Sequence, residues 1–228
     1  GANVNTADLE RIRQNLQAHL SQGFFSQQES IGITRDLRAL LAQLKSMTTV
    51  DEGSLFAIFT QAWELIVLCG EQLGAQEFDS VLDLRPLLPH ILHVLAWTGA
   101  SQLLGLEFLL MAVKCARVAC QYSPSSIRRL VDAGLVPLLT QQLLQVEYID
   151  LAEDLIFILQ LLSRPGAHPS ACLHADGVRA VLGFVDFHAL PVQVSAFSAA
   201  AQMCTALTSE SLYLSPDLIG QLQQTVRS

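Results

Sequence analysis

The sequence predicts an all-α protein built as a stack of helical repeats. Apolar residues recur with helical period along nearly the whole chain, and no segment alternates as a half-buried strand does. Glycine and proline residues interrupt this pattern at intervals of roughly 10–20 residues, which suits short connections between antiparallel helices. One segment also occurs twice, and this repetition is the strongest of the three observations.

The repeated segment is Leu130–Leu139 (LVDAGLVPLL), which matches Leu173–Leu182 (LHADGVRAVL) at an offset of 43 residues. A weaker copy, PLLPHI, begins at Pro86, where Pro89 matches Pro137 at an offset of 48 residues. A period in the forties with two or three helices per unit is typical of armadillo and HEAT repeats. We therefore expect a right-handed superhelical armadillo/HEAT-like solenoid of about four to five repeats.

Each unit should contain a short first helix, a second helix and a longer third helix. The first helix ends at Gly134 or Gly177, where a residue without a Cβ atom permits a sharp turn. The predicted second helices are Leu135–Leu144 and Val178–Phe187, and the predicted third helices are Tyr148–Ser163 and Val192–Leu207. The apolar stripes of successive third helices should pack into a continuous core. The stripe of the first copy is Leu151, Leu155, Ile158, Leu159 and Leu162, and that of the second is Val194, Phe197, Ala201 and Cys204.

The upstream part follows the pattern less regularly. Further helices are predicted at Ala7–Gln22, Thr34–Ser46, Phe56–Gln72 and Leu103–Gln121. We interpret residues 1–228 as one repeat domain: N-terminal helices or a cap over 1–50, degenerate repeats over 51–123, the two best-defined repeats over 124–208, and a terminal repeat or cap beginning at 209–228.

Composition excludes several classes of function. The net charge is −8, whereas nucleic-acid binding requires clustered Lys and Arg, so no nucleic-acid partner is expected. The apolar stretches considered for a membrane span, Leu103–Val113 and Leu155–Leu162, are too short, and no membrane partner is expected. The five cysteines form no CxxC pair, which favours buried thiols in an intracellular protein of the cytoplasm or nucleus.

Sequence signatures of catalysis are absent: GxSxG, GxxxxGK[ST], GxGxxG and HExxH do not occur. His90 and His93 share a helix face, but no cluster of Cys, Asp or Glu completes a metal site beside them. We predict no catalytic residue, metal or cofactor in this chain.

Carboxylates offer a candidate binding surface. On a helix running from Tyr148, the side chains of Glu147, Asp150 and Asp154 would fall within about 60° of arc. Third helices line the concave side of an armadillo stack, so this strip could hold a basic peptide. The alternative is that these acids compensate the dipole at a helix N-terminus. The predicted ligand-facing ladder, taken together, is Glu107, Lys114, Glu147, Asp150, Asp154 and Gln193.

Two family comparisons follow from short motifs. Nuclear-import receptors carry Trp-x-x-x-Asn pairs on their third helices. Here the residue four positions after Trp63 is Val67, and the one four positions after Trp97 is Ser101, which disfavours that class. A second progression runs from YIDLAE at Tyr148 through LQLLSR, ACLHADG and VLGFVDF to Gln193 and AAAQMC at Ala199. It resembles the armadillo region of HECT-type ubiquitin ligases of the ubiquitin-fusion-degradation and thyroid-receptor-interacting class.

This resemblance is best over Leu109–Leu207 and departs from the family at Asp176, where Gly is common. It implies a module that binds protein or peptide substrates, or ubiquitin, while a separate HECT domain carries the catalytic cysteine. A free-standing armadillo scaffold in trafficking or complex assembly is the alternative. Because the chain opens with Gly1, we expect it to be part of a longer protein.

Overall fold

The computed structural model describes residues 27–47, 51–96, 103–183 and 185–209, and these residues contain helices and no strand. The predicted helix Ala7–Gln22, the terminal segment from 210 and Trp97 lie outside the described residues. The elements are α2 (Gln27–Ser46), α3 (Glu52–Val81), α4 (Leu88–Leu95), α5 (Leu103–Tyr122), α6 (Pro124–Asp132), α7 (Leu135–Leu144), α8 (Ile149–Leu162), α9 (Pro169–His174), α10 (Gly177–Leu182), the short 3₁₀ helix η1 (Val185–Phe187) and α11 (Leu190–Ser209).

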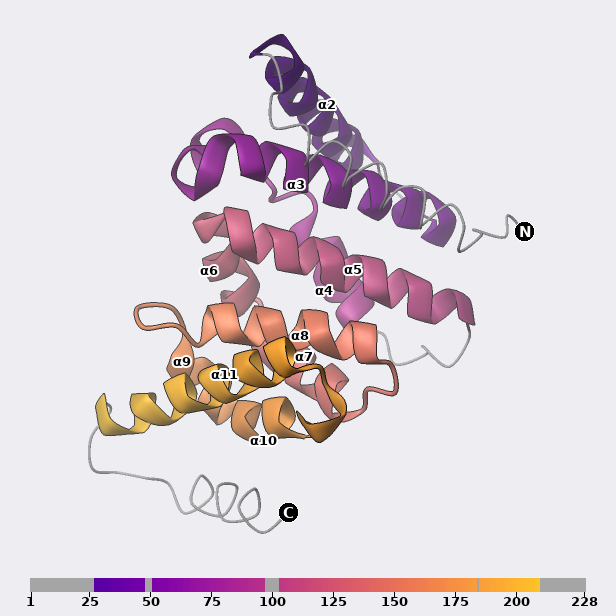
Figure 1. The fold of residues 1–228 in the computed structure, drawn as a ribbon. Coiled ribbons are helices and arrows are strands. Elements are labelled where there is room, and N and C mark those ends of the chain that lie inside the picture. Colours follow the sequence, from indigo (N-terminus) through magenta and orange to yellow (C-terminus); the bar gives the residue numbers. More distant parts are fainter. Residues whose placement is uncertain (1–26, 48–50, 97–102, 184, 210–228) are drawn as a thin grey trace.

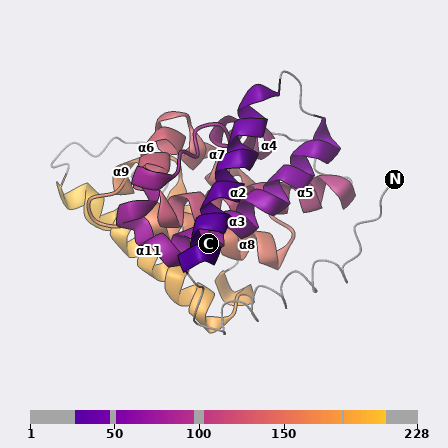
Figure 2. The same ribbon diagram turned by 90° about the horizontal axis from the view of Figure 1, so that it is seen from above.

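The four long helices α3, α5, α8 and α11 lie side by side in sequence order, each packed on the next (Figure 1). The short helices complete a second layer: seen from above, α4, α6 and α7 occupy one side, and α8 and α11 the other (Figure 2). This arrangement confirms the predicted stack of α-helical repeats. Consecutive long helices are therefore the positions where one surface can run across several repeats.

The repeat units differ between the two halves of the described chain. Residues 124–209 hold two three-helix units, α6–α8 and α9–α11, whereas α4 and α5 form a helix pair. The predicted second helix Leu135–Leu144 coincides with α7, and the prediction Leu103–Gln121 differs from α5 by one residue. Periodicity located these helices well because each buries one stripe in the core.

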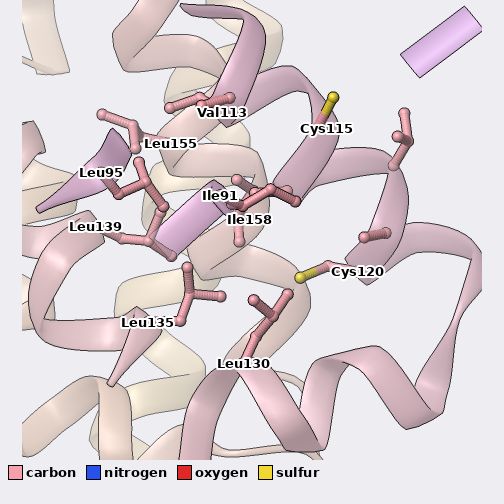
Figure 3. Packing of buried hydrophobic residues seen from close by; sticks show 14 of the residues in the cluster. Ile91, Leu95, Val113, Cys115, Cys120, Leu130, Leu135, Leu139, Leu155 and Ile158 are labelled. Atoms are coloured by element: carbon pink, nitrogen blue, oxygen red, sulfur yellow. The ribbon is translucent and has the colours of Figure 1, made fainter. Parts of the chain in front are cut away.

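The core is a continuous apolar layer between the long and the short helices. Figure 3 shows its centre, where Ile91 and Leu95 of α4 meet side chains of α5, α6, α7 and α8. Leu130, Leu139 and Leu155 in this layer are fully buried. No single unit could cover its own stripe, so stability depends on contacts between neighbouring repeats.

A polar clamp also joins two repeats at the start of α6. Ser123 caps this helix, since its Oγ accepts the Ser126 N–H at 3.2 Å, and Pro124 occupies the first turn. Asp79, near the end of α3, accepts the Ser125 N–H at 2.8 Å and a hydrogen bond from the Ser123 hydroxyl. The cap thus also fixes the end of α3.

The turns between first and second helices use two different residues. Gly134 has φ 92°, as its predicted role in a sharp turn requires. In the next unit the left-handed residue is Asp176, with φ 62°, and not Gly177 as predicted. Gly177 is instead needed for close packing, because a Cβ atom there would lie 2.4 Å from the Cys172 carbonyl oxygen.

Gly177→Ala is accordingly expected to lower the free energy of unfolding by about 1–3 kcal/mol, as overpacking does, because the clashing atom belongs to the backbone and cannot rotate away. Chemical denaturation measures the change. Gly32→Ala is the matched control: a Cβ atom added there would meet no described atom within 4 Å, and alanine in a helix should stabilise by about 0.5–1 kcal/mol. Equal effects at both glycines would contradict a packing role for Gly177.

The last repeat departs from two sequence predictions. The second helix predicted over Val178–Phe187 ends at Leu182, because Gly183 leaves helical geometry with ψ 128° and η1 follows. The predicted α11 core stripe is also wrong: Val194, Phe197 and Ala201 are exposed. The buried side chains of α11 are four alanines and one methionine: Ala196, Ala199, Ala200, Ala206 and Met203. Alanines let α11 approach α8 and α10 closely, so the larger side chains point away from them.

Helix α3 is, by length and composition, apolar enough to cross a membrane, contrary to the expectation that the longest apolar stretches are Leu103–Val113 and Leu155–Leu162 and that both are too short. In this fold it is a core helix: Phe59, Ala62 and Ile66 are fully buried, and the helix packs between α2 and α5. It is also kinked at Gly74, which has φ 68° and ψ 168°.

Candidate functional site

The surface that spans the repeats is formed by the outward sides of α3, α5, α8 and α11, which we call the third-helix face. On α5 its residues recur every three or four positions, as a single helix stripe requires: Glu107, Leu110, Lys114, Arg117 and Gln121. The α8 stripe contains Asp150, Glu153, Phe157 and Gln160. Polar and aromatic side chains therefore share this face.

Asp154 links α8 to α5 at the centre of the third-helix face through ion pairs. Its side chain is only 4% exposed and accepts Lys114 Nζ at 3.2 Å and the Arg117 guanidinium, both from α5. The two cations are 30% and 38% exposed, so they reach water while their shared carboxylate does not. The prediction that Asp154 belongs to a solvent-facing acidic strip is wrong. Its carboxylate neutralises cations of the neighbouring repeat because a buried charge needs partners.

Aromatic rings flank the same cations. Lys114 Nζ lies 5.7 Å from the centre of the Trp63 ring on α3, and the Arg117 guanidinium lies 4.1 Å from the centre of the Phe157 ring on α8. Cations over ring faces are attracted by the ring quadrupole. Cations and rings from three consecutive long helices thus form one connected row across three repeats.

The other predicted site residues fall into different places. Glu107 is half-buried on α5, and Asp150 is exposed in the first turn of α8. Glu147 precedes α8 and does not share its helical arc, because the helix begins only at Ile149. Gln193 does not face outward as a ligand: its Nε2 donates to the His188 carbonyl oxygen at 2.8 Å and so holds the segment after η1.

The sequence did not single out Arg117 and Phe157, which belong to the third-helix face, or His188, which lies directly after η1. Arg117 and Asp154 are 37 residues apart, close to one repeat length, so complementary charges at this spacing on predicted third helices were a usable signal. No comparable signal exists for His188, whose position depends on the end of α10 and the turn into η1.

The cysteines are not activated for chemistry. All five are free thiols, and burial raises the pKa of Cys120 and of Cys172 to about 12. Burial raises the pKa of Cys115 as well, and its Sγ donates to the Phe59 carbonyl oxygen at 3.2 Å, away from Lys114. Desolvation likewise lowers the pKa of His90. Within the described ranges no group of three or more His, Cys, Asp or Glu residues could hold a metal.

Comparison with known proteins gives this helical stack a context. Residues 14–174 match a family described as E3 ubiquitin-protein ligase TRIP12-like, TPR repeats. The chain is 29% identical to E3 ubiquitin-protein ligase UPL4 of Arabidopsis thaliana over 82% of its own length, and 31% identical to E3 ubiquitin-protein ligase UPL3 of the same plant over 71%. It is also 31% identical to E3 ubiquitin-protein ligase TRIP12 of Danio rerio over 85%.

These relatives are much longer than the chain, which spans 12%, 8% and 9% of them respectively. TPR units are helix pairs, like α4 with α5, whereas residues 124–209 form three-helix units of the armadillo kind. The prediction of a helical-repeat segment related to ubiquitin ligases is confirmed. Because the match covers most of its residues, the chain belongs to the TRIP12-like E3 ubiquitin-protein ligase family, as a part of its helical-repeat region.

Proposed function

We propose that this chain is the partner-binding repeat module of a HECT-type E3 ubiquitin-protein ligase, which holds protein substrates while a catalytic domain elsewhere in the parent protein transfers ubiquitin. The relatives are E3 ubiquitin-protein ligases by name, and the chain spans a small part of each. The observation that carries the proposal is the third-helix face, which presents cations and aromatic rings from three successive repeats.

Such a face suits an extended polypeptide. It runs across helices held rigidly by a common core, so a bound segment can contact several repeats without rearranging them. Buried thiols with raised pKa values support a binding role over a thioester-forming one, since the thiolate is the nucleophile in ubiquitin transfer. Free cysteines also support placement inside the cell, in the cytoplasm or nucleus.

Site-specific photo-crosslinking in the full-length parent ligase tests this function. A photoreactive amino acid is placed at Asp150 or Gln121 on the third-helix face and, as controls, at Arg128 or Asp132 on the outer helix α6; all four positions are exposed. We expect crosslinked proteins from the first pair that the parent ubiquitinates. Substrate ubiquitination should also fall several-fold in an Asp150→Arg, Gln121→Glu parent that retains autoubiquitination.

Autoubiquitination separates loss of binding from loss of catalysis. Crosslinks of equal yield from α6, or unchanged ubiquitination of every crosslinked protein in the double variant, would refute substrate binding by this face. In that event a scaffold in complex assembly becomes the better account.

A further inference from the structure

A pocket of about 300 Å³ lies where the connection between α7 and α8 meets the segment around η1. Its walls include Val146 and Ala152 on one side and Phe187 on the other. It therefore sits between two successive repeats, at the ends of the long helices α8 and α11. Two polar groups in this otherwise apolar site, Glu147 and His188, indicate what it could hold.

His188 lines the pocket and is 8% exposed, yet its Nδ1 has no hydrogen-bond partner among the described residues. The backbone around it is fixed: its N–H donates to the Val185 carbonyl oxygen at 3.1 Å, and its carbonyl accepts Gln193 Nε2 at 2.8 Å. A buried polar atom without a partner is unfavourable by about 1–3 kcal/mol. A ligand that hydrogen-bonds to Nδ1 would remove this penalty.

Glu147 supplies the negative charge of the pocket. Its side chain is exposed, and within the described part of the chain no cation pairs with it. Asp150 and Asp186 are also exposed and lie close in sequence to the lining residues, but they do not line the pocket. Asp154 on α8 shows the contrast, because its carboxylate is paired with Lys114 and Arg117.

Aromatic surface completes the site. Tyr148 and Phe187 both line the pocket and are 50% and 76% exposed. A delocalised planar cation stacks on such rings.

We propose that this pocket receives an arginine side chain of a bound polypeptide. The guanidinium would pair with the Glu147 carboxylate and donate to His188 Nδ1, while its plane stacks on an aromatic ring and its methylenes cover Val146 and Ala152. An apolar anchor would leave both polar groups unmatched, and an acidic one would be repelled. A lysine ammonium could also donate to both acceptors, but it has no plane that stacks on an aromatic ring.

This inference rests on the proposed function, since it names the chemistry of the partner that the module binds. The test uses the 228-residue chain and N-acetyl-arginine amide as the probe, with the matching citrulline and lysine amides as controls. NMR spectra follow the His188 ring signals during titration. Citrulline has nearly the shape of arginine without its charge, so the pair isolates the ionic contribution.

We expect saturable shifts of the His188 signals with the arginine amide, and affinity about tenfold weaker for citrulline and lysine. Glu147→Gln should weaken arginine binding to a similar degree, whereas Glu153→Gln, a neutralisation outside the pocket lining, should change it less than about twofold. Glu147 is exposed, so its variant should fold normally.

Equal affinity for arginine and citrulline, no saturable shift, or stronger binding of N-acetyl-tryptophan amide would each overturn the arginine assignment. These failures differ from failure of the proposed function. If crosslinks form on the third-helix face but the arginine amide does not bind, only the pocket assignment falls. If the amide binds and no ubiquitinated partner crosslinks, the proposed function falls.

Discussion

Leu155→Ala is expected to lower the free energy of unfolding by about 2–5 kcal/mol, the range for large-to-small changes in a packed core. Leu155 is fully buried and lies at the centre of the layer that joins α8 to the neighbouring helices (Figure 3). Its replacement removes apolar contacts and leaves a cavity that rigid helices on both sides cannot close. Urea denaturation followed by circular dichroism gives the change.

Leu190→Ala is the matched control, because it makes the same chemical change at an exposed position of α11. It should alter stability by less than about 0.5 kcal/mol. Similar losses at the two leucines would show that the core does not pass through α8 as described.

Asp154→Ala is expected to destabilise the fold by about 2–4 kcal/mol, although the sequence alone placed this residue on the surface. The carboxylate is buried between two repeats and holds Lys114 and Arg117 of α5. Without this carboxylate, both cations lose their shared counter-charge, and the ion pairs that join α5 to α8 are lost. The loss stays below that of a fully buried pair because both cations reach water. Thermal and urea denaturation both report it.

Asp150→Ala, one turn earlier on the exposed part of α8, should change stability by less than about 0.5 kcal/mol. An Asp150→Ala, Asp154→Ala double variant is consequently unsuitable as a test of partner binding, since its folding would change together with its surface. If Asp154→Ala proved as stable as the wild type, the ion-pair cluster would not hold the repeats together.

Position in the stack decided which side of α11 is buried. Val194 and Phe197 occupy a third helix, and their apolar character predicted burial, yet Ala196, Ala199 and Met203 form the packed side of α11. Periodicity identifies a helix and its apolar residues. The side that meets a neighbour depends on how closely the adjacent helix approaches, and small residues decide that here.

The amino-acid sequence by itself determined the all-α class, the repeat period, most helix positions and the relation to ubiquitin ligases. These properties follow from contacts within a turn or two of helix, from residues such as Gly134 that permit special backbone angles, and from motifs short enough to compare. Tertiary structure alone decided which charged residues face solvent and which are paired. Asp154 meets Arg117 across 37 residues, and His188 enters a pocket made by two repeats, because such meetings depend on the register between stacked helices.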